Sequence, residues 1–167
     1  RGWNGINIDA NPDTIKLFQK ARPDDINLCV GVSGKLDTLN YHRFSDPAVN
    51  TFSSEEAEHW KQKKWLTYLG NIPVETKPLV NIFRENIKAG QHIDVLSVDV
   101  EGLDLEVLES NDWNQYRPQV VVVEAHDFTF EGMYKHPIYQ LLTTRGYQLQ
   151  HKMKFSLIFE LPKKNHA

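Results

Sequence analysis

Short apolar runs alternate with amphipathic stretches at both ends of this chain. The apolar runs have the length and β-branched character of strands, and they cover residues 5–9, 26–33, 92–100 and 119–125. Segments with apolar residues at helical spacing follow three of these runs, at 10–21, 101–110 and 136–146. Asn11 and Pro12 are typical of a helix start. This alternation predicts an α/β protein with a doubly wound, mostly parallel sheet.

Two stretches depart from this alternation. Residues 147–161 predict two strands in a late antiparallel hairpin. Residues 35–78 contain two predicted strands around a charged helix, which indicates an insertion. We therefore expect one domain over 1–167 that carries an insertion at about 35–78.

Three of the predicted strands end in acidic residues. Asp9 closes the first, Asp99 and Glu101 the third, and Glu124 the fourth, with His126 two residues later. Asp99 and Glu101 are two residues apart, so a strand would point both to the same face. Because ligands of open parallel sheets bind outside the carboxyl ends of the strands, these acids predict a ligand site.

Asp9 has the position of an acid that binds the two hydroxyls of a ribose. Such an acid normally follows a glycine-rich turn by about 20 residues, whereas only eight residues precede Asp9 here. We therefore expect the first strand of the sheet, with its cofactor loop, to be missing from this chain. The residues predict a nucleoside-binding domain and do not choose between NAD and S-adenosylmethionine.

Several segments together resemble the FkbM-type S-adenosylmethionine-dependent methyltransferases. They are "RGWNGINIDANP", "INLCVGVSG", "NTFS", "IDVLSVDVEGLDLEVLES" and "RPQVVVVEAH", and they occur in this order along the chain. The resemblance implies a Rossmann-like methyltransferase fold and S-adenosylmethionine as the cofactor. It also implies methyl transfer to a hydroxyl oxygen of a sugar, natural product or lipid.

The resemblance divides the candidate residues into two groups. The resemblance implies that six residues bind the cofactor, namely Asp9, Ala10, Asn11, Val32, Ser33 and Asp99. It also implies that three catalytic candidates lie near the transferred methyl group and the acceptor, namely Glu101, Glu124 and His126. The hydroxyls of Thr51 and Ser53 are further candidates for contact with the acceptor.

Three functions remain open at this point. In an O-methyltransferase, His126 is the best base by its intrinsic pKa, and Glu124 or Glu101 can serve if burial raises theirs. In a metal-assisted enzyme, the acids and His126 would hold Mg²⁺, although no spacing here is diagnostic of a metal motif. The third possibility is a truncated, non-catalytic domain that binds a partner.

Net charge and hydropathy limit the kinds of partner that we expect. The net charge of −3 argues against nucleic acid, and no apolar stretch is long enough to span a bilayer. We expect a cytoplasmic protein with a small-molecule or glycan acceptor. Cys29, the single cysteine, lies in an apolar run and is expected in the core.

Overall fold

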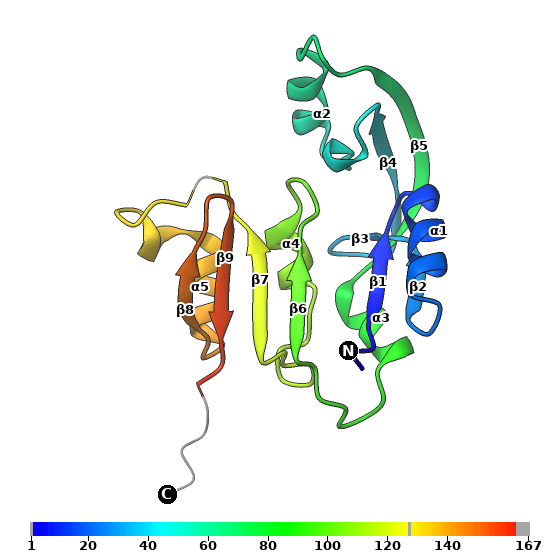
Figure 1. Ribbon diagram of the computed structural model, residues 1–167. Coiled ribbons are helices and arrows are strands. Elements are labelled where there is room, and N and C mark those ends of the chain that lie inside the picture. The colour runs from blue at the N-terminus through cyan, green and yellow to red at the C-terminus, as the bar shows by residue number, and fades with distance from the viewer. Residues whose placement is uncertain (1, 127, 163–167) are drawn as a thin grey trace, which may run out of the picture.

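The computed structural model describes residues 2–126 and 128–162 and contains three small sheets (Figure 1). The first joins β1 (Ile6–Asp9) to β2 (Ile26–Cys29), and the two strands are parallel. Helix α1 (Pro12–Ala21) connects them. It begins where the side chain of Asn11 accepts a hydrogen bond from the backbone N–H of Asp13, so the predicted helix start is confirmed.

The largest sheet has four strands and carries the main core. Its order is β6 (Val95–Val98), β7 (Val120–Glu124), β9 (Ser156–Glu160) and β8 (Gln148–Lys152). β6 and β7 are parallel, whereas β8 and β9 form the late antiparallel hairpin that the sequence predicted. Three helices accompany this sheet, namely α3 (Leu79–Asn86), α4 (Asp104–Glu109) and α5 (Pro137–Thr144). The core includes fully buried Val121, Val123, Leu108 and Leu142.

The insertion forms a separate ribbon. β4 (Asp37–Phe44) pairs antiparallel with β5 (Tyr68–Lys77), and the short β3 (Gly31–Val32) joins β5 in parallel. Between β4 and β5 the chain forms the 3₁₀ turn η1 (Pro47–Val49) and helix α2 (Ser54–Lys61). A second 3₁₀ turn, η2 (Met133–Lys135), precedes α5. The insertion has a small core of its own, made by Phe44, Val49 and Ala57, which explains how it keeps its shape beside the main sheet.

The expected doubly wound sheet is present only in part. β1 and β6 lie side by side and run in the same direction, yet no described strand bridges them (Figure 1). The strand expected over 26–33 is interrupted at Val30, and its two parts belong to different sheets. The prediction that Cys29 is a core residue is wrong. It lies on the outer strand of a two-stranded sheet and is exposed.

Among the described residues, every helix is too short and too polar to cross a lipid bilayer.

Candidate active site

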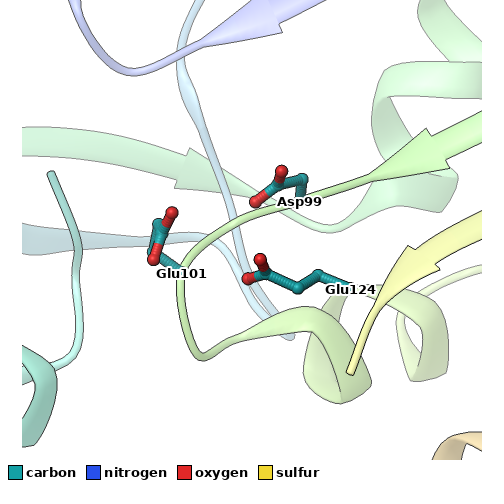
Figure 2. Close-up of side chains that lie close together, drawn as sticks. All are labelled: Asp99, Glu101 and Glu124. Atoms are coloured by element: carbon teal, nitrogen blue, oxygen red, sulfur yellow. The ribbon is translucent and has the colours of Figure 1, made fainter. Parts of the chain in front are cut away.

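The acidic strand ends meet in space at one edge of the main sheet (Figure 2). Carboxylate oxygens of Asp99, Glu101 and Glu124 all lie within 4.8 Å of one another. Asp99 and Glu101 follow β6, and Glu124 is the last residue of β7. Since β6 and β7 are parallel neighbours, their carboxyl ends meet at the same edge, as the sequence predicted.

Glu101 is held in an unusual backbone conformation. Its φ of 51° lies in the left-handed region, which non-glycine residues seldom adopt, and Gly102 follows with a φ of 102°. The buried carboxylate of Asp104 accepts hydrogen bonds from the backbone N–H groups of Val100, at 3.3 Å, and Gly102, at 3.4 Å. The hydroxyl of Thr51 donates to the carbonyl oxygen of Glu101 at 2.7 Å. These contacts fix the turn that presents the Glu101 carboxyl group.

Burial and mutual repulsion raise the pKa values of the clustered acids. Partial burial, and then the charges of Glu124 and Asp99, raise the pKa of Glu101 to about 7. Burial, followed by the charge of Asp99, also raises the pKa of Glu124, and His126 opposes this rise. Glu101 therefore exchanges a proton near neutral pH, which is the property required of a general base or acid.

Glu124 and His126 form a pair at the same edge. Nε2 of His126 lies 3.0 Å from Oε1 of Glu124. The side chain of His126 is 60% exposed, whereas that of Glu124 is only 13% exposed. The imidazole ring also packs against Phe155, with the ring centroids 4.8 Å apart. Glu124 thus positions His126 at the rim of the site.

A cavity of about 350 Å³ lies beside Asp9, and we call it the β1 cavity. Four of the predicted cofactor residues line it, namely Asp9, Ala10, Val32 and Asp99. The carboxylate of Asp9 accepts a hydrogen bond from the backbone N–H of Asn11 at 2.7 Å, which orients it. Burial raises the pKa of Asp9. The cavity therefore combines a positioned carboxylate with walls that are partly polar and partly apolar.

The remaining two predicted cofactor residues do not line the β1 cavity. The side chain of Asn11 caps α1. Ser33 is buried, and its hydroxyl lies 2.9 Å from that of Thr76 and donates to the carbonyl of Lys35. Asn11 and Ser33 thus support the walls from behind.

A larger cavity of about 670 Å³, the α2 cavity, opens on the other side of the acidic cluster. Glu55, Glu56, His59 and Trp60 of α2 line it, and Glu101, Glu124 and His126 line it from the main sheet. Glu101 therefore contributes to the walls of both cavities. The structure brings all three predicted catalytic residues to the α2 cavity.

The insertion contributes residues that the sequence did not single out. Tyr41 and Phe52 line the β1 cavity, with their ring centroids 4.9 Å apart. Burial and the nearby charge of Asp9 raise the pKa of Tyr41 to about 12. The order of residues along the chain gives no sign that these rings lie near Asp9. Asp104 was also missed. It is the first residue of α4, and its carboxylate accepts hydrogen bonds from the preceding turn and does not cap the helix.

Thr51 and Ser53 were expected to offer their hydroxyls to the methyl acceptor, but both hydroxyls bond to the protein itself. Thr51 is only 1% exposed, and it bonds the Glu101 turn. The hydroxyl of Ser53 accepts a hydrogen bond from the backbone N–H of Glu56 and caps α2. Both residues shape the site from outside the two cavities.

Comparison with known families identifies the class of this domain. The profile described as "Methyltransferase FkbM domain" matches residues 1–149. The chain belongs to the FkbM methyltransferase family. The resemblance noted in the sequence is thereby confirmed, and the FkbM match includes the whole acidic cluster and the lining of both cavities. Neither a curated protein nor a solved structure gives a significant match to this FkbM domain.

Proposed function

We propose that this FkbM domain transfers a methyl group from S-adenosylmethionine to a hydroxyl oxygen of a small-molecule or glycan acceptor. The observation that carries the proposal is the position of Glu101, which lines both the β1 cavity and the α2 cavity. A residue between two binding cavities can contact both reactants of a group transfer. Its pKa of about 7 allows it to take up a proton at neutral pH.

The β1 cavity fits the nucleoside part of the cofactor. The positioned carboxylate of Asp9 is suited to accept hydrogen bonds from two ribose hydroxyls. Ala10 and Val32, with the rings of Tyr41 and Phe52, supply the apolar surface that an adenine base needs. Asn11 and Ser33 hold these walls in place.

Asp99 and Glu101 suit the charged end of the same cofactor. S-adenosylmethionine supplies an electrophilic methyl group on a positively charged sulfonium. Two carboxylates whose mutual repulsion is relieved by that positive charge would favour the sulfonium form over its neutral product. A positive charge in this position would account for the cluster of acids at the edge of the sheet. Without it, several partly buried carboxylates so close together are costly.

The α2 cavity is the proposed acceptor site. Carboxylates from α2 and the main sheet offer hydrogen-bond acceptors to a hydroxyl-bearing molecule, and Trp60 offers a flat apolar face. We favour Glu101 as the base that removes the hydroxyl proton, since it lines both cavities. The pair of His126 and Glu124 would orient the acceptor and carry the proton onward to solvent.

Two measurements on the natural full-length polypeptide test this proposal. Calorimetry with S-adenosylhomocysteine should detect binding, and radiolabelled S-adenosylmethionine should transfer label to a hydroxyl-bearing acceptor from a glycan and natural-product panel. Binding that Asp9→Ala does not weaken would contradict the assignment of the β1 cavity. A truncated, non-catalytic domain that binds a partner, the remaining alternative from the sequence, would transfer no label.

A second candidate is metal-assisted transfer, which the three converging carboxylates favour. Asp99, Glu101 and Glu124 offer oxygen ligands within 4.8 Å of one another, the type of donor that Mg²⁺ prefers. Such a metal would bind the acceptor oxygen and lower the pKa of its hydroxyl, so that the proton could pass to water without Glu101 as base. Removal of divalent ions with a chelator separates the two schemes. Loss of turnover that added Mg²⁺ restores favours the metal, whereas unchanged turnover favours Glu101 as base.

A further inference from the structure

Four exposed apolar side chains lie at one end of the main sheet, and we call this surface the hairpin patch. The turn between β8 and β9 contributes Met153 and Phe155, and the segment between β7 and α5 contributes Phe130 and Tyr134. Each of the four is between 43% and 71% exposed. Figure 1 shows both segments at the end of the sheet where β7 finishes. The hairpin patch therefore adjoins the edge that carries the acidic cluster.

The two segments of the hairpin patch meet at a cavity of about 480 Å³. Phe130 and Lys152 both line this cavity, and Lys152 directly precedes Met153 in the turn. Tyr139 lines it as well, and the ring of Tyr134 packs against that of Tyr139 with the centroids 5.8 Å apart. The exposed apolar side chains thus belong to one continuous surface.

The hairpin patch is positively charged, although the chain as a whole has a net charge of −3. Lys135, Lys152 and Lys154 accompany the apolar side chains, whereas Glu131 is the only acid in 128–135 and 150–155, which the structure describes throughout. None of these lysines forms an ion pair with a described carboxylate. The positive charge is a local feature, and it complements a negatively charged surface.

The lysines of the turn combine charged and apolar parts. Nζ of Lys154 lies 4.5 Å from the centre of the Phe155 ring. Nζ of Lys152 donates to the carbonyl oxygens of Met153 and Lys154, which holds the turn in shape. An ammonium group beside an aromatic ring suits the boundary between lipid headgroups and acyl chains, because each part meets the medium that it prefers.

We propose that the hairpin patch docks this domain on an anionic lipid surface. Its four apolar side chains would enter the boundary region, where aromatic side chains are favoured, and its lysines would lie at the level of the phosphates. A second copy of the chain fits less well. A symmetric dimer through this surface would bring the lysines of one copy against those of the other, which is unfavourable.

Docking through the hairpin patch would also position the acceptor site, an extension that rests on the proposed function. The ring of His126 packs against that of Phe155, with the centroids 4.8 Å apart, and His126 lines the α2 cavity. The α2 cavity would then lie beside the lipid headgroups. The acceptor class that follows is a hydroxyl group carried by a lipid headgroup or by a glycan attached to a lipid.

Vesicle co-sedimentation tests the hairpin patch without cofactor or activity. The natural full-length polypeptide is mixed with vesicles of phosphatidylcholine alone, or of phosphatidylcholine and phosphatidylglycerol in equal parts. Binding to the anionic vesicles should be roughly tenfold tighter and should weaken as the salt concentration rises, because salt screens the lysines. Absence of binding to the anionic vesicles would overturn the proposal.

A double variant removes part of the apolar surface. Tyr134→Ser with Met153→Ser should weaken binding to the anionic vesicles roughly tenfold, because two apolar side chains no longer leave water on docking. Leu36→Ser with Leu69→Ser is the matched control, since both leucines are exposed and belong to the insertion. Equal binding by the two double variants would overturn the proposal.

A second pair of variants tests the charge. Lys135→Gln with Lys154→Gln should weaken binding to the anionic vesicles roughly tenfold and reduce its dependence on salt. Lys20→Gln with Lys88→Gln makes the same change in net charge at exposed positions on α1 and after α3, and it should leave binding nearly unchanged. Equal weakening by both pairs would mean that net charge governs binding, which would contradict a localised docking surface.

Sedimentation velocity separates a lipid surface from a second copy. Self-association that Tyr134→Ser with Met153→Ser abolishes, without vesicle binding by the wild type, would make a second copy the occupant and overturn the proposal. The outcomes are also distinct from those of the proposed methyl transfer. Vesicle binding without transfer of label would support the hairpin patch and contradict the function, whereas transfer without vesicle binding would do the reverse.

Discussion

The hydroxyl of Thr51 donates a 2.7 Å hydrogen bond to the backbone carbonyl of Glu101, across 50 positions of sequence. This bond links the insertion directly to the acidic turn that follows β6. Glu101 has a left-handed backbone conformation that costs about 1–3 kcal/mol, so its neighbours must hold it there.

Thr51→Val removes this donor while it keeps the shape of the side chain. We expect the free energy of unfolding to fall by about 1–3 kcal/mol, because the partly buried carbonyl of Glu101 and the backbone N–H of Ser53 both lose their partner, and turnover to fall with it. Urea denaturation and a methyl-transfer assay measure both. Thr38→Val on β4 is the matched control, since Thr38 is exposed and far from the turn in sequence. Equal stability of the two variants would show that the Thr51 bond does not hold the turn.

Glu101→Gln removes the proposed base and one charge that faces the cofactor. We expect turnover to fall at least tenfold, the effect of losing one good contact in the transition state. In the wild type, turnover should rise as the pH increases through about 7, because the ionised carboxyl is the active form. The variant should lose this rise. A rise at the same pH in Glu101→Gln would assign the base to another residue.

The same substitution has an opposite effect on stability. Folding raises the pKa of Glu101 to about 7, so the folded state prefers the protonated form. The stability that this preference provides is complete below pH 4.5 and is lost as the pH rises through 7. We therefore expect Glu101→Gln to match the wild type at pH 4.5 and to exceed it at pH 8 by on the order of 1 kcal/mol, a value reduced by solvent screening.

Thermal unfolding at the two pH values provides the measurement. Glu75→Gln on β5 is the control, because Glu75 is exposed and lies outside both cavities. A stability difference that is the same at pH 4.5 and pH 8 would argue against a raised pKa at Glu101.

Asp9→Ala tests the ribose contact in the natural full-length polypeptide. Loss of charge-assisted hydrogen bonds to two hydroxyls should weaken binding of S-adenosylhomocysteine by about 2–3 kcal/mol in calorimetry. Asp13→Ala is the control, because Asp13 lies on the neighbouring helix with a 68% exposed side chain paired to Lys16. Unchanged affinity in Asp9→Ala would remove Asp9 from the cofactor site.

Gly31→Ala tests the wall of the β1 cavity. An added Cβ would lie 2.6 Å from Cζ of Phe52 and 2.8 Å from Cγ2 of Thr76, so the ring has to move. We expect a loss of about 1–3 kcal/mol of stability, the usual cost of overpacking, and weaker binding of S-adenosylhomocysteine. Gly5→Ala should have a small effect, since its Cβ meets only the side chain of Asp25, at 3.4 Å. Cofactor affinity equal to wild type in Gly31→Ala would show that Phe52 does not bound the ligand.

The strand ends could be predicted from the sequence because each is a local signal. Asp9, Asp99 and Glu124 close apolar runs, and the parallel arrangement of β6 and β7 brings the last two together. The helix start at Asn11 is equally local, since its capping bond spans two residues.

The rest of the site depends on contacts between distant segments. Thr51 meets Glu101 across 50 residues, and Tyr41 and Phe52 line the same cavity as Asp9 although they lie more than 30 residues away along the chain. Hydrophobic spacing carries no information about such contacts. The exposure of Cys29 was missed for a similar reason, since an apolar run does not reveal that its strand has a neighbour on one side only.

The insertion over residues 35–78 faces both cavities while it keeps a small core of its own. Glu55, Glu56 and His59 of α2 face the larger cavity, whereas Ala57 packs inward. Trp60 lines the cavity and also packs, partly buried, against the small core. Exchanges at Glu55, Glu56 and His59 therefore alter the lining of the α2 cavity without changing the residues of the main core or of the β1 cavity. For protein engineering, a small library at these three positions would vary the proposed acceptor site while Ala57 and Trp60 keep the small core of the insertion.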